Sequence, residues 1–146
     1  MFKRSDFRVN ATASLHLKDA AGRPMFYTPA ASSPGEKVEQ RPVRIEVYGP
    51  GSAVNANAQQ DAKRRLLAWA KEGRDLQARD VAERAADVAE VLAAITAGVE
   101  GIDLEGESVI DAMRGFYADP ACGYVVDQVN EFAAAWANFS NGAPKA

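Results

Sequence analysis

The side chains best suited to chemistry are few in this chain and stand far apart. Its single histidine, His16, lies on the polar side of a segment that alternates like a strand, so we expect an exposed surface histidine. No second histidine completes a metal site, and no serine stands in a Gly-x-Ser-x-Gly turn. The single cysteine, Cys122, falls in the first turn of a predicted helix, where we expect it to pack and not to act in redox chemistry.

Carboxylates crowd the segment that follows Gly101, at positions 103, 105, 107 and 111. They lack the Asp-x-Asp-x-Asp-Gly order of an EF-hand calcium loop, and acidic residues near a helix N-terminus are favoured by the helix dipole in any case. The glycines at 49 and 51, and at 98 and 101, match neither a P-loop nor a dinucleotide fingerprint. The sequence therefore predicts no catalytic residue, no metal site and no cofactor, and we do not expect an enzyme.

Length and composition favour one domain over residues 1–146. A chain of this length with 47% hydrophobic residues can bury a core without metal or disulfide support. Its net charge of −3 disfavours general binding of nucleic acid. The basic run at 63–65 is interpreted as a solvated helix face, with contact to a phosphate or an acidic protein as the alternative. The apolar stretch 88–99 is too short to span a bilayer and no signal peptide is evident, so we expect a cytoplasmic protein without membrane insertion.

Strand-like alternation is confined to the first third of the chain, residues 7–48. Apolar residues occupy the odd positions of 7–17, a turn signal follows at 19–24, and residues 25–28 are expected to return as the partner strand of a hairpin. Residues 43–48 predict a third strand of the same half-buried kind. The intervening segment 29–42 is rich in breakers and is expected to be a mobile loop. These patterns predict a small antiparallel sheet.

The region 53–139 predicts about four helices, so the fold class is α+β and mainly α. The expected helices cover residues 53–71, 81–99, 108–117 and 120–139. Ser52, Asp80, Ser108 and Asp119 are expected to cap their N-termini, and Gly73 to end the first. Glycines at 98, 101 and 106 make residues 96–104 a hinge between the second helix and the last two.

Apolar residues of the second and fourth helices recur in alternating steps of four and three, which is the spacing of a coiled coil. Such stripes either fill the core of one chain or contact a partner, and both alternatives stay open at this point. Large amphipathic aromatic groups are enriched in protein contacts, which favours a protein partner or a homo-oligomer. The candidate partner surface comprises Trp69, Val88, Leu92, Ile95, Val99, Val129, Phe132, Trp136 and Phe139.

The order of these features resembles the tail assembly chaperones of long-tailed, siphophage-type bacteriophages. The resemblance covers nearly the whole chain and is carried by the turn 48–52 and by segments 92–102, 116–120, 127–129 and 136–139. It implies a non-enzymatic assembly factor that binds the tape-measure protein and recruits tail-tube subunits to it. Such a factor works in the host bacterial cytoplasm and is absent from the mature virion. It would cover exposed apolar helices of the tape measure by a helix-in-groove mode.

Two other classes of protein fit a small, acidic, non-catalytic chain. One is a virion structural protein of the tail or of the head–tail joining region, but tube subunits are dominated by β-structure, whereas about two-thirds of this chain is predicted to be helical. The other is a regulatory DNA-binding protein, which the acidic balance and the lack of a basic recognition helix disfavour.

Overall fold

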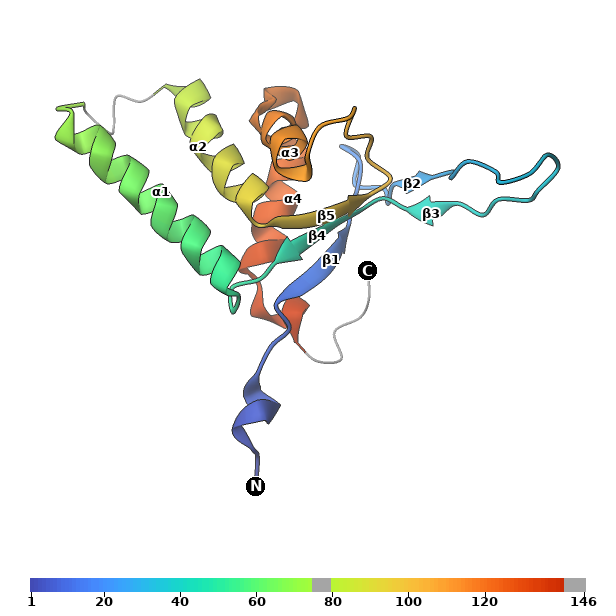
Figure 1. Ribbon diagram of the computed structural model, residues 1–146, viewed down its shortest axis with the longest axis horizontal. Helices are drawn as coiled ribbons and strands as arrows, with labels where there is room; N and C mark the ends of the chain where they lie inside the picture. The colour runs from blue at the N-terminus through green and yellow to red at the C-terminus, as the bar shows by residue number, and fades with distance from the viewer. Residues whose placement is uncertain (75–79, 141–146) are drawn as a thin grey trace.

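A three-stranded antiparallel sheet carries helices on one face, and a thin two-stranded arm projects from one end (Figure 1). The computed structural model describes residues 1–74 and 80–140. About 49% of the chain is helical and 16% is strand, which confirms the predicted α+β, mainly α class. The helical share is nearer one half than the two-thirds expected.

The sheet is built around β4 (Arg44–Tyr48), which lies between β1 (Thr12–His16) and β5 (Thr96–Glu100). Ile45 and Val47 of β4 are fully buried, while Glu46 between them is exposed. This alternation is the one that the sequence predicts for a strand with one wet face. The helices therefore pack against the face that carries Ile45 and Val47.

The expected hairpin between segments 7–17 and 25–28 forms only in part. Its turn is present, because the Asp19 carboxylate accepts from the backbone N–H groups of Ala21 and Arg23 at 2.9 and 3.0 Å. Apart from one bridge between Lys18 and Pro24, the two segments do not pair as strands with each other. β1 pairs instead with β4, and β2 (Phe26–Tyr27) pairs with β3 (Arg41–Pro42), at the end of the predicted loop 29–42. Those two short strands begin the arm in Figure 1.

The largest departure from prediction lies after Ile95. The second helix, α2 (Val81–Ala94), ends five residues before Val99, and the first five residues of the expected hinge 96–104 form the edge strand β5. The free edge of β4 accounts for this change, since its backbone groups need partners. The Tyr48 N–H donates to the Ile95 carbonyl at 2.8 Å, and Thr96 lies opposite Val47. β-branched residues at 95, 96 and 99 suit a strand better than a helix.

The predicted helix starts are confirmed by side-chain caps. α1 (Ala53–Lys71) begins where the Ser52 hydroxyl accepts from the backbone N–H of Asn55 at 3.1 Å. Asp80 caps α2 and Ser108 caps α3 (Val109–Ala118) in the same way, at 2.8 and 3.2 Å. Gly73 follows α1 with φ of +77°, the left-handed conformation expected after a helix C-terminus.

The predicted helix 120–139 is divided into three pieces. A 3-10 turn, η3 (Pro120–Cys122), precedes α4 (Gly123–Ala134), and the extended backbone of Ala135 separates α4 from a second 3-10 turn, η4 (Trp136–Phe139). This break turns Phe139 into the core, with none of its surface exposed, and leaves Trp136 57% exposed. The ring of Phe139 lies over Gly49, where a Cβ atom would stand 2.5 Å from it.

A buried hydroxyl pair joins α3 to the end of α2. The Thr96 hydroxyl lies 2.8 Å from the Leu92 carbonyl and 2.8 Å from the Tyr117 hydroxyl. Because a hydroxyl has one hydrogen, Thr96 donates to Leu92 and accepts from Tyr117. Burial raises the pKa of Tyr117 to about 12.

Candidate binding groove

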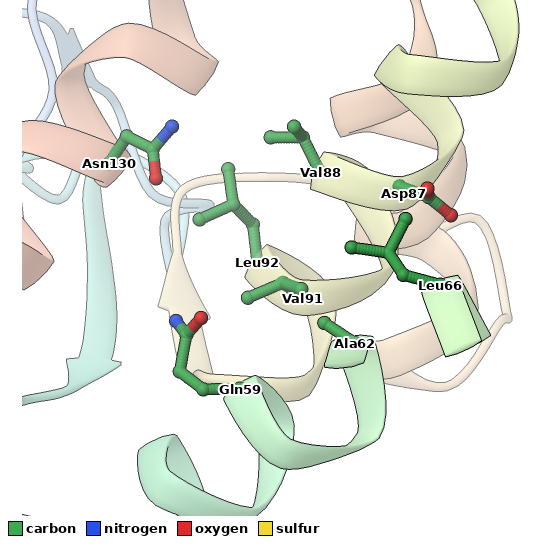
Figure 2. A pocket seen from close by; sticks show the side chains of 8 residues that line it. All are labelled: Gln59, Ala62, Leu66, Asp87, Val88, Val91, Leu92 and Asn130. Atoms are coloured by element: carbon green, nitrogen blue, oxygen red, sulfur yellow. The ribbon is translucent and has the colours of Figure 1, made fainter. Parts of the chain in front are cut away.

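Helices α1 and α2 meet near the sheet and diverge away from it (Figure 1). Between them and α4 lies a cavity of about 230 Å³. Figure 2 shows its lining, which consists of Gln59, Ala62 and Leu66 from α1, Asp87, Val88, Val91 and Leu92 from α2, and Asn130 from α4. The cavity is therefore bounded by three helices whose residues are far apart in the sequence.

A second cavity of about 230 Å³ continues the first one towards the sheet. The two share Gln59, Val91, Leu92 and Asn130, and the second ends against Pro50, Asn55, Ile95, Ala133 and Ala134. We call the two cavities together the α1–α2–α4 groove. Its length follows α2 from Asp87 to Ile95, which is a little over two helical turns.

The groove combines an apolar floor with a few polar groups at its sides. Leu66, Val88, Val91 and Leu92 are among its apolar lining residues, and Asp87 is the one charged residue among the described residues that line it. Within the described part of the chain, the side-chain amides of Gln59 and Asn130 make no hydrogen bond. An apolar ligand with one or two polar groups at its edges fits such a surface best.

The candidate partner residues separate into different environments. Core positions are held by Leu92, Ile95, Val129 and Phe139, which are 0–2% exposed. Val88, by contrast, is 37% exposed above the groove. Leu92 and Ile95 also contribute to the groove floor, so the structure brings these three candidates together.

The other four candidates lie away from the groove lining. Trp69 is half-buried near the end of α1, with the Arg74 guanidinium 4.4 Å from its ring. Val99 is half-buried on β5, and Phe132 packs its ring edge-on against Phe139 at 5.6 Å. Trp136 lies beside Gly51, where a Cβ atom would be 3.3 Å from its ring. The nine candidates thus do not form one continuous surface.

Several groove residues lie outside the predicted set. Ala62 and Leu66 are one helical turn apart, a spacing visible in the sequence as part of the apolar stripe of α1. Gln59 and Asn130 carry no comparable signal, because an exposed amide on a helix is an ordinary surface residue. Only the packing of α1, α2 and α4 brings these two amides to the same cavity.

The residues with catalytic potential serve local structure. His16 is half-buried, its Nε2 lies 2.8 Å from the Met25 carbonyl, and its ring packs edge-on against Phe26, so the expectation of an exposed histidine is wrong. Burial, together with the nearby Asp119 carboxylate, raises the pKa of the Cys122 thiol. Its position at the start of the fourth helical segment therefore does not favour the thiolate.

The carboxylates after Gly101 are likewise engaged locally. Asp103 accepts from the Glu105 backbone N–H at 2.8 Å. Asp111 pairs with Arg114 at 2.8 Å, and Arg114 reaches Glu90 of α2 at 2.7 Å, which raises the pKa of the guanidinium. Across residues 1–74 and 80–140, no group of three or more His, Cys, Asp or Glu side chains is placed to hold a metal ion.

The three cations of the basic run 63–65 lie in three different environments. Arg64 pairs with Asp61 one turn earlier at 3.3 Å, and Lys63 is exposed. Arg65 is half-buried, and its Nε and one terminal nitrogen have no hydrogen-bond partner among the residues described. The three cations therefore do not present a single uniform basic surface.

Comparison with known proteins gives no relative: no protein-family model, no curated protein and no solved structure matches the chain. Of the helices in the described ranges, none combines the length and the apolar character needed to cross a bilayer.

Proposed function

We propose that this chain is a tail assembly chaperone of a long-tailed bacteriophage, which acts in the host bacterial cytoplasm. It binds the tape-measure protein in the α1–α2–α4 groove and recruits tail-tube subunits to the complex. The sequence resemblance described above suggests this class of protein. The structural observation that supports it is an open, mainly apolar groove bounded by three helices.

The shape and chemistry of the groove suit an amphipathic helix. Two adjoining cavities of about 230 Å³ can each receive an apolar side chain, and a helix presents such side chains at intervals of three and four residues. Gln59 and Asn130 can bond polar groups at the edge of that helix, because their amides are not used inside the described chain. A tape-measure helix bound in this way would have its apolar face removed from water.

Co-expression with the tape-measure protein tests the proposal. The wild-type chain is expected to increase the soluble fraction of the tape measure and to co-purify with it. Leu66→Glu places a charge in the apolar groove and is expected to weaken binding by about tenfold or more. Leu67→Glu is the matched control, since Leu67 follows directly on α1, is 61% exposed and does not line the groove.

A second pair of variants repeats the comparison on α2. Val88→Glu alters a groove residue that is 37% exposed, and Val81→Glu alters one that is 81% exposed outside the groove. All four variants should keep the far-UV circular dichroism of the wild type, because none replaces a fully buried side chain. Failure of the wild type to co-purify, or equal binding by groove and control variants, would contradict the assignment.

The virion itself provides an independent test. A chaperone leaves the finished particle, whereas a structural protein of the tail or of the head–tail joining region stays in it. Mass spectrometry of purified virions is therefore expected to detect the tail-tube protein and not this chain. Detection of the chain at a fixed ratio to the tube protein would support the structural alternative instead.

A further inference from the structure

Residues 1–8 form a small folded segment that extends from the body of the molecule and that we call the hook (Figure 1). The 3-10 turn η1 (Arg4–Phe7) shapes it, and the Lys3 backbone N–H donates to the Asp6 carboxylate at 2.7 Å. This turn brings the rings of Phe2 and Phe7 into edge-to-face contact at 5.7 Å. The two rings are nevertheless 82% and 73% exposed, so the hook carries an apolar surface that faces solvent.

The root of the hook is fixed beside one end of the α1–α2–α4 groove. The Asn10 backbone N–H donates to the Phe139 carbonyl at 2.7 Å. The preceding residue, Val9, lies against Gly51, where a Cβ atom would be 2.8 Å from its side chain. Gly51 follows Pro50, which lines the second cavity, at the end of the groove nearest the sheet. The hook therefore leaves the body close to a groove that it does not enter.

Charge also distinguishes the hook from the rest of the chain. It holds three cations, Lys3, Arg4 and Arg8, against one acid, Asp6, whereas the whole chain has a net charge of −3. The remaining residues thus carry five more acids than cations. The hook and the rest of the chain therefore carry net charges of opposite sign, which favours contact between the hook of one copy and the body of another.

We propose that the hook of one copy of this chain inserts Phe2 and Phe7 into the α1–α2–α4 groove of a second copy. The hook leaves the body at Val9, next to the end of the groove that is lined by Pro50. A two-fold axis near Gly51 would therefore bring the hook of each copy to the groove of the other, so that both contacts form in one dimer. The eight residues of the hook span less than about 30 Å even when extended, which limits the exchange to a closely apposed dimer. Two aromatic rings fit the two adjoining cavities, and the preformed turn lowers the entropy lost on binding.

This dimer requires no phage protein, so it is tested with the purified chain alone. In sedimentation equilibrium the wild type is expected to dimerise reversibly as its concentration rises. Phe2→Ser with Phe7→Ser should raise the dissociation constant by about a hundredfold or more, because each copy loses the two rings that it would bury in the other, four in all. Phe26→Ser is the matched control, since Phe26 is 53% exposed but lies on β2, outside the hook, and it should leave the constant unchanged.

Complementary variants make the test specific to hook and groove. The double serine variant keeps an intact groove, and Val88→Glu keeps an intact hook. Each is expected to be monomeric alone, whereas a mixture of the two should form a heterodimer through its one intact contact. A photo-crosslinking residue at position 2 should, in such a mixture, label peptides of α1 and α2 from the other copy.

Three results would overturn the inference. These are a wild type that stays monomeric up to its solubility limit, a dimer that survives the double serine change, and a mixture that forms no heterodimer. These three results are obtained without the tape measure, so they are judged separately from the co-expression test, although the hook and a tape-measure helix would compete for the same groove. Conversely, failure of the co-expression test would leave this dimer standing.

Discussion

Gly49→Ala is expected to destabilise the fold because the new methyl group has no room. Its Cβ atom would lie 2.5–2.6 Å from three carbons of the Phe139 ring, whereas carbon atoms in contact are about 3.5–4.0 Å apart. The ring would have to move by about 1 Å, and Phe139 is fully buried. Phe139 follows the break at Ala135, so its movement would displace the 3-10 turn η4.

The size of the effect follows from two opposing contributions. Overpacking a rigid core costs about 1–3 kcal/mol. Replacing glycine restricts the unfolded chain and recovers about 0.4–1 kcal/mol. The free energy of unfolding should therefore fall by about 1–2 kcal/mol. Gly98→Ala is the control, because its nearest atom, Oε2 of Glu46, would be at an ordinary 3.8 Å, and that change should be neutral or slightly stabilising.

Urea unfolding followed by far-UV circular dichroism measures these differences. Phe139→Ala alone should cost about 3–5 kcal/mol, since it empties a fully buried site. In that background Gly49→Ala should cost almost nothing, so the double-mutant cycle should show a coupling of about 1–2 kcal/mol. Strict additivity, or equal effects of the two glycine changes, would refute the claim that the ring of Phe139 limits the space at Gly49.

Three further perturbations test other features. Burial raises the pKa of Tyr117 to about 12, against an ordinary 10, so stability is unaffected by this group below pH 10 and should fall by up to about 3 kcal/mol as pH rises through 12; unfolding measured across that range should show the fall, and Tyr117→Phe should abolish this component. Trp136→Ala should cost less than about 2 kcal/mol in urea unfolding, since Trp136 is 57% exposed, and a loss as large as that for Phe139→Ala would place it in the core. Asp80→Ala removes the side chain that caps α2 and should lower the free energy of unfolding by about 1 kcal/mol. An unchanged melting temperature would contradict this prediction.

Local sequence signals predicted the starts of the elements well. Ser52, Asp80 and Ser108 cap the helices that they precede, because a short polar side chain satisfies backbone N–H groups without help from distant residues. The alternation of residues 43–48 also predicted β4, since one buried face needs a period of two. In each case, residues within a few positions of one another were enough to predict where the helix or strand begins.

Sequence reasoning failed where a distant segment decides the local structure. The four-three spacing continues to Val99, yet β4 draws residues 96–100 into the sheet, and nothing within that segment reports the position of β4. The buried face of α2 also differs from the four-three spacing, which starts at Val81: Val81 is 81% exposed, whereas Ala89 and Ala93, which lie outside that spacing, are buried. Small residues let α3 approach α2 closely, so burial there follows packing more than hydrophobicity.

The sequence predicted several of the residues that α2 contributes to the groove, but not the residue Asn130 that α4 contributes. Val88, Leu92 and Ile95 share a stripe of predicted period, and they do line the cavities. Asn130 joins them only because α4 crosses α2, and no residue near it in the sequence indicates that crossing. A concave site made by three helices depends on their relative placement, which is a property of the whole fold.

Ile95 is the only residue between the last turn of α2 and the first residue of β5, and it leaves the chain no slack. A rotation of α2 about its axis would therefore reach β5 first at Thr96. Thr96 and Gly98 lie opposite two adjacent residues of β4, Val47 and Glu46, so Ala97 is the extra residue of a β-bulge, at which the pairing can absorb such a rotation. An occupant that moved Ile95 in the groove would therefore act on the pairing of β4 with β5 close to this bulge.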